Sequence, residues 1–268
     1  MLLREVEYAR PASVGDAVRL LAEHDGARAL AGGQTHVNVM KARAVSADVH
    51  VDLNRLDEWK GIELGADGTL VIGAMTTYTE LVESAEARAR PILGEVCAQI
   101  ADVQVRNRGT IGGNVCSNDP TNHLPPLMVA LGATMTIRSA GGERAVPAEE
   151  FFLGVYMTAA GPGELLTKVT VPAGKADGFA ALPIGREGTC IVNAAASLDG
   201  GALRVAIGCV EAVPVLLRPA STEEDAVREA VRSAGLQPPD DVHASSAYRR
   251  HLAEVLAVRA VRAAEERT

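Results

Sequence analysis

Two short segments with paired glycines constrain this chain more than any other feature of its sequence. The first, Ala31-Gly32-Gly33-Gln34-Thr35, directly follows a short apolar stretch, and the second is Thr110-Ile111-Gly112-Gly113-Asn114. Paired glycines allow tight turns with positive φ and let a ligand approach the main chain closely. Successive N–H groups in such a turn form a concave site for an anion. Two such sites facing each other would suit a ligand with two phosphate groups.

Each segment taken alone has a simpler explanation, because a glycine pair is most often only a turn. Neither segment carries the Gly-Lys-Ser/Thr of a Walker motif, and neither contains the G-x-G-x-x-G of a Rossmann nucleotide site. From the spacing alone, the sequence therefore indicates at most a phosphate-binding protein.

The chain around these segments alternates between helix and strand signals. Ser13 can cap a helix that begins at Val14 and that Gly26 can stop, and Thr77 with Glu80 forms a capping-box pattern. An Asp67-Gly68 turn between two apolar stretches predicts a β-hairpin. We expect helices over 91–100 and 124–130, and strands over 27–30, 49–52, 62–64, 70–72, 133–137 and 165–171.

The pattern breaks at residues 173–178, where we expect a domain boundary. Beyond it, two stretches joined by Asp199-Gly200-Gly201 predict a hairpin, and helices are expected over 223–234 and 247–266. The predicted organisation is a first domain of residues 1–174, with parts at about 1–57 and 58–174, and a second domain of residues 178–268.

Composition excludes several classes of protein. The 268 residues are 47% hydrophobic and 22% charged, which is ordinary for a globular chain. The net charge of -8 without a dense Lys/Arg stripe argues against nucleic acid or an anionic membrane as partner. No apolar run is long enough to span a membrane and no signal-like core opens the chain, so we expect a cytoplasmic protein. The four cysteines contain no C-x-x-C pair, so no metal site is predicted in this chain.

In their order and separation, the two glycine segments resemble those of the flavin-binding subunits of the molybdenum hydroxylase family, which includes aerobic carbon monoxide dehydrogenase and xanthine dehydrogenase. The resemblance covers nearly the whole chain and implies an α+β fold. A two-part FAD-binding domain of the vanillyl-alcohol-oxidase (PCMH) type would precede a small C-terminal α+β domain of the CO dehydrogenase flavoprotein type. The further segments that carry the resemblance are Tyr8-Ala9-Arg10-Pro11, Arg106-Asn107-Arg108-Gly109, Asp119-Pro120 and Ile191-Val192-Asn193-Ala194-Ala195.

The resemblance also implies which residues hold FAD. The stretch from Ala29 to His36 would wrap the pyrophosphate from one side, and Thr110 to Asn114 would close it from the other. Ile100 falls where the family places a residue near the flavin ring, and Leu166 where an aliphatic side chain packs on the cofactor. The implied FAD-binding residues are Ala29, Leu30, Ala31, Gly32, Gly33, Gln34, Thr35, His36, Ile100, Thr110, Ile111, Gly112, Gly113, Asn114, His123 and Leu166.

Two positions depart from the family pattern. His123 stands where the family usually has an aspartate that contacts the cofactor, so the fixed negative charge is missing there. Pro183 stands where a lysine is frequent, and Lys175 and Arg186 are the candidate replacements. Arg106 and Arg108 could approach phosphates, or could equally pair with acidic neighbours at a subunit contact.

The function implied by the resemblance is electron transfer through FAD. A large molybdopterin subunit would oxidise the substrate, and a small iron–sulfur subunit would relay electrons through [2Fe-2S] clusters to FAD and then to an external acceptor. No catalytic residue is expected in this chain, because the cofactor carries the chemistry. Two alternatives are a self-sufficient FAD-dependent reductase or oxidase of the same fold, and a scaffold subunit that has lost FAD.

Overall fold

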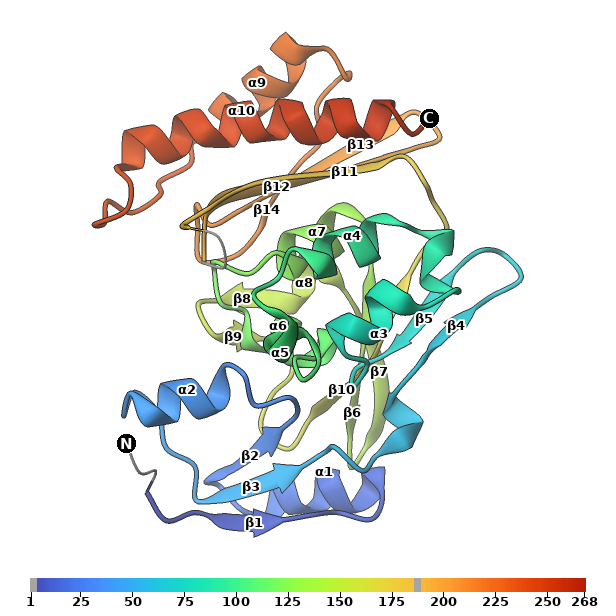
Figure 1. Ribbon diagram of the computed structural model, residues 1–268, viewed down its shortest axis with the longest axis vertical. Helices are drawn as coiled ribbons and strands as arrows, with labels where there is room; N and C mark the ends of the chain where they lie inside the picture. Colours follow the sequence, from blue (N-terminus) through green and yellow to red (C-terminus); the bar gives the residue numbers. More distant parts are fainter. Residues whose placement is uncertain (1–3, 186–188) are drawn as a thin grey trace.

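The computed structural model describes residues 4–185 and 189–268, which form three larger β-sheets placed one after another along the long axis of the molecule (Figure 1). The N-terminal sheet is parallel, with the order β1-β3-β2. Helices α1 and α2 connect its strands. Because the strands are parallel, their carboxyl ends meet at one edge of the sheet. The elements are β1 (Glu7–Ala9), α1 (Val14–Glu23), β2 (Ala27–Leu30), α2 (His36–Lys41) and β3 (Val49–Asp52).

The central sheet is antiparallel and has the order β4-β5-β10-β6-β7. The predicted hairpin between its first two strands is confirmed, and Gly68 turns the chain with a φ of +83°. A short hairpin of β8 (Phe152–Gly154) and β9 (Met157–Thr158) lies beside this sheet. The five strands are β4 (Ile62–Leu64), β5 (Leu70–Gly73), β6 (Thr134–Ser139), β7 (Gly142–Pro147) and β10 (Leu165–Val171).

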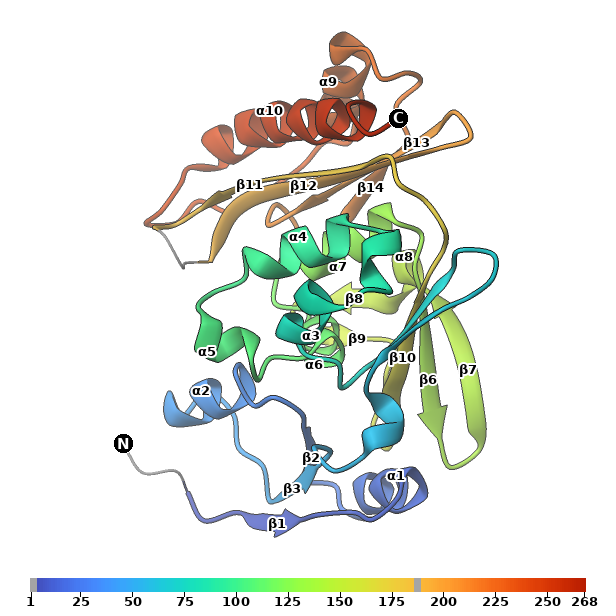
Figure 2. The same cartoon turned by 45° about the vertical axis from the view of Figure 1, so that its right-hand side comes forward.

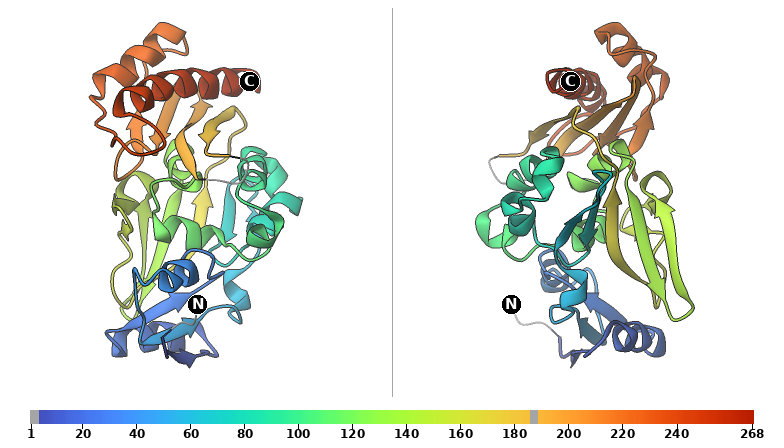
Figure 3. Two further views of the ribbon diagram at one scale, coloured as in Figure 1. Left: turned by 60° about the vertical axis from the view of Figure 1, so that its left-hand side comes forward. Right: turned by 90° about the vertical axis from the view of Figure 1, so that its right-hand side faces the viewer.

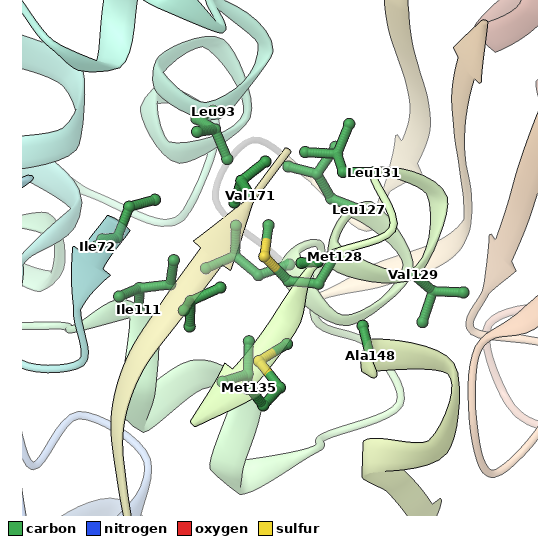
Figure 4. Close-up of a cluster of buried hydrophobic side chains, with 14 of the residues drawn as sticks. Ile72, Leu93, Ile111, Leu127, Met128, Val129, Leu131, Met135, Ala148 and Val171 are labelled. Carbon is green, nitrogen blue, oxygen red and sulfur yellow. The ribbon is translucent and has the colours of Figure 1, made fainter. Parts of the chain in front are cut away.

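Short helices cover one face of the central sheet (Figure 3). Their apolar side chains form the largest core cluster, in which Ile72, Leu93, Met128 and Val171 come together (Figure 4). All seven residues of α7 are buried, because this helix lies between two sheets. The helical elements are η1 (Asp57–Trp59), α3 (Tyr78–Glu83), η2 (Ala87–Ala89), α4 (Ile92–Ala98), α5 (Val103–Arg106), α6 (Ile111–Ser117), α7 (Leu124–Ala130) and α8 (Ala148–Phe151).

The C-terminal sheet, in the order β11-β12-β13-β14, lies between two helical layers (Figure 2). Helices α9 and α10 pack on one face, while α4 and α7 lie on the other. Strand β12 is therefore buried on both sides: Ala194 and Ala196 belong to the cluster under α10, and Ala195 belongs to the central core. The elements are β11 (Asp177–Pro183), β12 (Cys190–Asp199), β13 (Ala202–Gly208), β14 (Val215–Leu217), α9 (Glu224–Ser233) and α10 (Ser246–Glu265).

The structure confirms the predicted strands and both predicted hairpins, and it corrects some boundaries. The helix capped by Ser13 ends at Glu23 rather than at Gly26, and the helix predicted over 91–100 spans only Ile92–Ala98. The sequence analysis did not foresee β1, β7, β8, β9, β14 or the short helices α2, α5, α6 and α8. The predicted domain limits stay a prediction.

Two kinds of feature are absent from the part of the chain that the structure describes. No helix in residues 4–185 and 189–268 is long and apolar enough to cross a membrane. Within the same residues, no group of three or more His, Cys, Asp or Glu side chains is placed to hold a metal ion.

Candidate functional site

A cavity of about 340 Å³ lies at the carboxyl edge of the N-terminal parallel sheet. Ligands of open sheets with parallel strands bind in the crevice beyond these strand ends. Most of the cavity wall follows from this topology, since the ends of all three strands and the first glycine segment contribute to it. The lining residues are Tyr8, Arg10, Leu30, Ala31, Gly32, Gly33, Val37, Asp52, Asn54 and Arg108.

The two glycine segments face each other at this cavity. A Cβ atom added to Gly32 would clash with the carbonyl oxygen of Arg108 and would lie 2.7 Å from its carbonyl carbon and 3.0 Å from the Cα atom of Gly109. A Cβ atom on Gly113 would lie 3.7 Å from that of Ala31. Position 32 therefore requires glycine because two backbones meet there.

The first glycine segment leaves several backbone donors open. Gly33 has a φ of +75°, and its carbonyl oxygen accepts from the amide of Val37 at 3.0 Å as α2 begins. The amides of Gly33, Gln34 and Thr35 donate no hydrogen bond to any part of the chain that the structure describes. Neighbouring unpaired N–H groups of this kind can donate to an anion, so the anion site expected at this segment stays a prediction.

The second glycine segment does not repeat this design, so that part of the prediction is wrong. Gly112 and Gly113 lie in the first turn of α6, and neither has a positive φ. The Thr110 hydroxyl caps this helix by accepting from the Gly113 amide at 3.0 Å, and the Gly112 amide donates to the carbonyl of Ala74 at 2.9 Å. A Cβ atom on Gly112 would lie 2.6 Å from that carbonyl oxygen. The second segment is thus a closely packed helix start and not a second set of open amides.

The two candidate arginines have different surroundings. The Arg106 guanidinium donates to the carbonyl oxygens of Ile100 at 3.0 Å and Ala101 at 2.6 Å, so it holds the turn before α5. Arg108 lines the cavity, and its side chain makes no hydrogen bond or ion pair with the residues that the structure describes. Arg108 therefore brings to the cavity wall a positive charge that has no partner among the described residues.

Asn114 carries a second unsatisfied group. Its side-chain amide donates to the hydroxyl of Tyr78 at 2.9 Å, while its Oδ1 atom is buried without a donor among the described residues. Burial raises the pKa of Tyr78, so this hydroxyl stays protonated. A buried acceptor without a partner is energetically costly.

The other predicted residues of the first segment have local partners. Ala29 pairs with Val51 within the parallel sheet, and the Gln34 carbonyl accepts from the side chain of Asn38 at 2.7 Å. His36 begins α2, and its Nε2 atom lies 3.2 Å from that of His50. Burial, followed by the nearby His50 and Arg28 charges, lowers the pKa of His36, so the imidazole pair is neutral near pH 7.

Of the sixteen predicted residues, Leu30, Ala31, Gly32 and Gly33 line the cavity and the other twelve do not. Four of these twelve lie away from the cavity. The side chain of Ile111 lies in the central core near Ile72 and Val171 (Figure 4), and Leu166 is 5% exposed within β10. Ile100 packs against the same core. His123 precedes α7, with its ring 5.3 Å from that of Phe179. Burial lowers its pKa to about 4, so the residue in place of the family aspartate is neutral.

At the other departure from the family pattern, Pro183 ends β11 at an irregularity in its pairing with β12. Lys175, a candidate replacement for the missing lysine, is exposed before that strand. Arg186 lies outside the described residues. Six residues of the cavity wall were not among the predicted FAD-binding residues, although Arg108 was a candidate phosphate contact. Asp52 is the last residue of β3, and Asn54 follows it closely. The six are Tyr8, Arg10, Val37, Asp52, Asn54 and Arg108.

Comparison of the chain with known protein families shows which family it belongs to. Residues 4–174 match the family model of the FAD binding domain in molybdopterin dehydrogenase. The chain belongs to the FAD-binding medium subunits of the molybdenum hydroxylases. This family assignment confirms the resemblance seen in the glycine segments.

Relatives match along most of the chain. The carbon monoxide dehydrogenase medium chain of Hydrogenophaga pseudoflava is 43% identical over 176 residues, which are 65% of this chain and 61% of that relative. The glyceraldehyde dehydrogenase medium chain of Sulfolobus acidocaldarius is 32% identical over 277 residues, or 96% of this chain and 97% of that relative.

A solved carbon monoxide dehydrogenase from Hydrogenophaga pseudoflava, which lacks the Mo-pyranopterin moiety of its molybdenum cofactor, has the same fold. It superposes with a TM-score of 0.92 at 33% identity and covers 99% of both chains. The predicted α+β fold of the FAD-binding medium subunit is thereby confirmed over the whole chain, as is its membership of an oxidoreductase complex.

Proposed function

We propose that this FAD-binding subunit transfers electrons from the [2Fe-2S] clusters of a small iron–sulfur subunit to an external acceptor, while a large molybdopterin subunit oxidises the substrate. The observation that carries the proposal is the cavity wall, to which the first glycine segment with its open amides and Arg108, unpaired among the described residues, both contribute. FAD, when bound, supplies chemistry in which electrons are accepted singly or in pairs. The names of the relatives, which are medium chains of dehydrogenases, support a chain that works with other subunits.

The residues at the cavity fit the diphosphate of FAD. The amides of Gly33, Gln34 and Thr35 are free to donate to phosphate oxygens, and Arg108 brings a positive charge from the facing segment. Close packing of Gly32 against Arg108 keeps the two segments together and limits the water between them. This chain's own part is therefore to bind and orient the cofactor. The predicted roles of Ile100, Leu166 and His123 at the flavin ring stay proposals.

The first prediction is that the chain releases FAD rather than FMN when it is heated. The first segment and Arg108 together offer more donors than one phosphate needs, whereas a diphosphate can use both sides of the cavity. Chromatography of the released flavin measures this. FMN alone, or no flavin after reconstitution with FAD, would contradict the proposal and favour the scaffold that has lost its cofactor.

The second prediction concerns the partners. Co-expression with the iron–sulfur and molybdenum subunits should give a stable complex in which substrate bleaches the flavin absorbance under anaerobic conditions. The isolated chain should show no bleaching with aldehydes, purines or other heteroaromatic compounds, because electrons must arrive from another subunit. Reduction of the iron–sulfur signal with the flavin still oxidised would refute the electron path. Bleaching of the isolated chain by a substrate would favour the self-sufficient enzyme instead.

A further inference from the structure

A side-chain contact continues the parallel sheet just where the first glycine segment leaves it. The amide of Leu53 donates to the carbonyl of Leu30 at 3.0 Å, which is the last backbone hydrogen bond between β3 and β2. One residue further along each strand, the side-chain amide of Asn54 donates to the carbonyl of Ala31 at 3.0 Å. A side-chain hydrogen bond thus holds Ala31 at the point where the backbone pairing of β2 and β3 ends.

Asp52 fixes the orientation of this Asn54 side chain. Its Oδ1 atom accepts from the backbone amide of Asn54 at 2.9 Å, which is an Asx turn, and from the Asn54 side chain at 2.6 Å. The other oxygen accepts from the Tyr8 hydroxyl and lies 3.4 Å from the guanidinium of Arg10. All three strands of the sheet therefore meet in one network at the cavity wall.

The network keeps a buried carboxylate charged. Asp52 is only 4% exposed. Burial alone would raise its pKa, but the hydrogen bonds from Tyr8 and Asn54 and the charge of Arg10 outweigh burial and hold the pKa below its usual value. With both oxygens engaged inside the protein, Asp52 has little capacity left to bind a ligand directly.

We propose that Asp52 and Asn54 are positioning residues that hold the first glycine segment in its FAD-binding conformation. The inference rests on the proposed function and deepens it. The two residues fix Ala31, and Gly33 with its open amides follows two positions later. A loop already held in its bound conformation loses less conformational freedom on binding, so these contacts increase affinity for the cofactor through preorganisation.

The test is an FAD titration of apo-protein carrying Asn54→Ala, Asp52→Ala or both, followed by flavin fluorescence, with thermal unfolding of each apo-protein measured in parallel. We expect each single variant to raise the dissociation constant of FAD about tenfold, the effect of losing roughly one hydrogen bond of preorganisation. The dissociation constant of the double variant should equal the larger of the two single-variant values, because Asp52 and Asn54 act together to hold Ala31. Tyr8→Phe, which removes one partner of Asp52, replaces Asp52→Ala if that variant does not fold.

Asp67→Ala is the matched control. Asp67 makes the same Asx turn, with its Oδ1 atom accepting from the Thr69 amide at 3.0 Å, in the β4–β5 hairpin away from the cavity (Figure 1). It should leave FAD affinity unchanged. The inference is overturned if wild-type protein binds FAD and Asn54→Ala binds it equally well, or if the two single effects multiply. If the wild-type protein binds no FAD, the proposed function fails and the inference fails with it.

Discussion

Replacing Gly32 with alanine should abolish FAD binding while leaving a folded protein. The new Cβ atom would clash with the carbonyl oxygen of Arg108, a backbone atom that cannot rotate away, so the two segments must separate. Overpacking of this kind costs about 1–3 kcal/mol in the protein itself. Because the separation also opens the cavity between the amides and Arg108, we expect FAD affinity to fall at least about 100-fold, or roughly 2.7 kcal/mol. The flavin-to-protein absorbance ratio after reconstitution measures the loss.

Gly15→Ala is the matched control for this substitution. Gly15 lies in α1, where an added Cβ atom would meet nothing closer than the Ser13 hydroxyl at 3.8 Å. Alanine in a helix is favoured over glycine by about 0.5–1 kcal/mol, so this variant should keep its flavin and unfold at the same or a higher temperature. A normal flavin content in Gly32→Ala would show that the two glycine segments do not enclose the cofactor.

Local signals in the sequence were sufficient to predict several of the helix starts and hairpin turns. Ser13 accepts from the amide of Asp16 at 3.1 Å, and Thr77 forms the expected capping box with Glu80. Gly200 and Gly201 turn the chain with φ values of +53° and +86° between β12 and β13. Each of these features depends on residues a few positions apart, so a single sequence can show them.

The second glycine segment shows where local reasoning fails. Two consecutive glycines each weaken a helix by about 1 kcal/mol, which favoured the interpretation as a turn. Tertiary packing decides otherwise, because Gly112 lies against the backbone of Ala74 and only a residue without a side chain fits there. The helix α6 thus depends on a contact between distant parts of the chain that spacing cannot reveal.

The cavity wall was only partly predictable for a related reason. Asp52 at the end of the predicted strand and Asn54 just after it were visible in the sequence, but the contact of Asn54 with Ala31 required knowing that β2 and β3 pair in parallel. The two open interpretations of Arg106 and Arg108 could likewise be separated only in three dimensions. Arg106 holds a turn, and Arg108 faces the cavity.

Loss of Arg90 should destabilise the protein more than any surface substitution. Its guanidinium makes two hydrogen bonds of 2.8 Å to the carboxylate of Asp177 and one of 3.0 Å to the hydroxyl of Ser197. The Arg90 and Asp177 side chains are only 3% and 1% exposed. Arg90 precedes α4, whereas its partners lie in β11 and β12, so this pair joins the helical layer to the C-terminal sheet.

Arg90→Met should lower the free energy of unfolding by about 3–5 kcal/mol, because it leaves the carboxylate of Asp177 buried without a partner. The double variant Arg90→Met with Asp177→Leu should recover much of this loss, since replacing both members removes the unpaired charge. Arg138→Met is the control: it breaks an ion pair with Glu143 whose side chains are 45% and 41% exposed, and it should cost less than about 1 kcal/mol. Urea unfolding of the three variants measures these values. A loss below about 1 kcal/mol for Arg90→Met would show that water reaches Asp177 and that the C-terminal sheet is held by its apolar contacts with α4 and α7 alone.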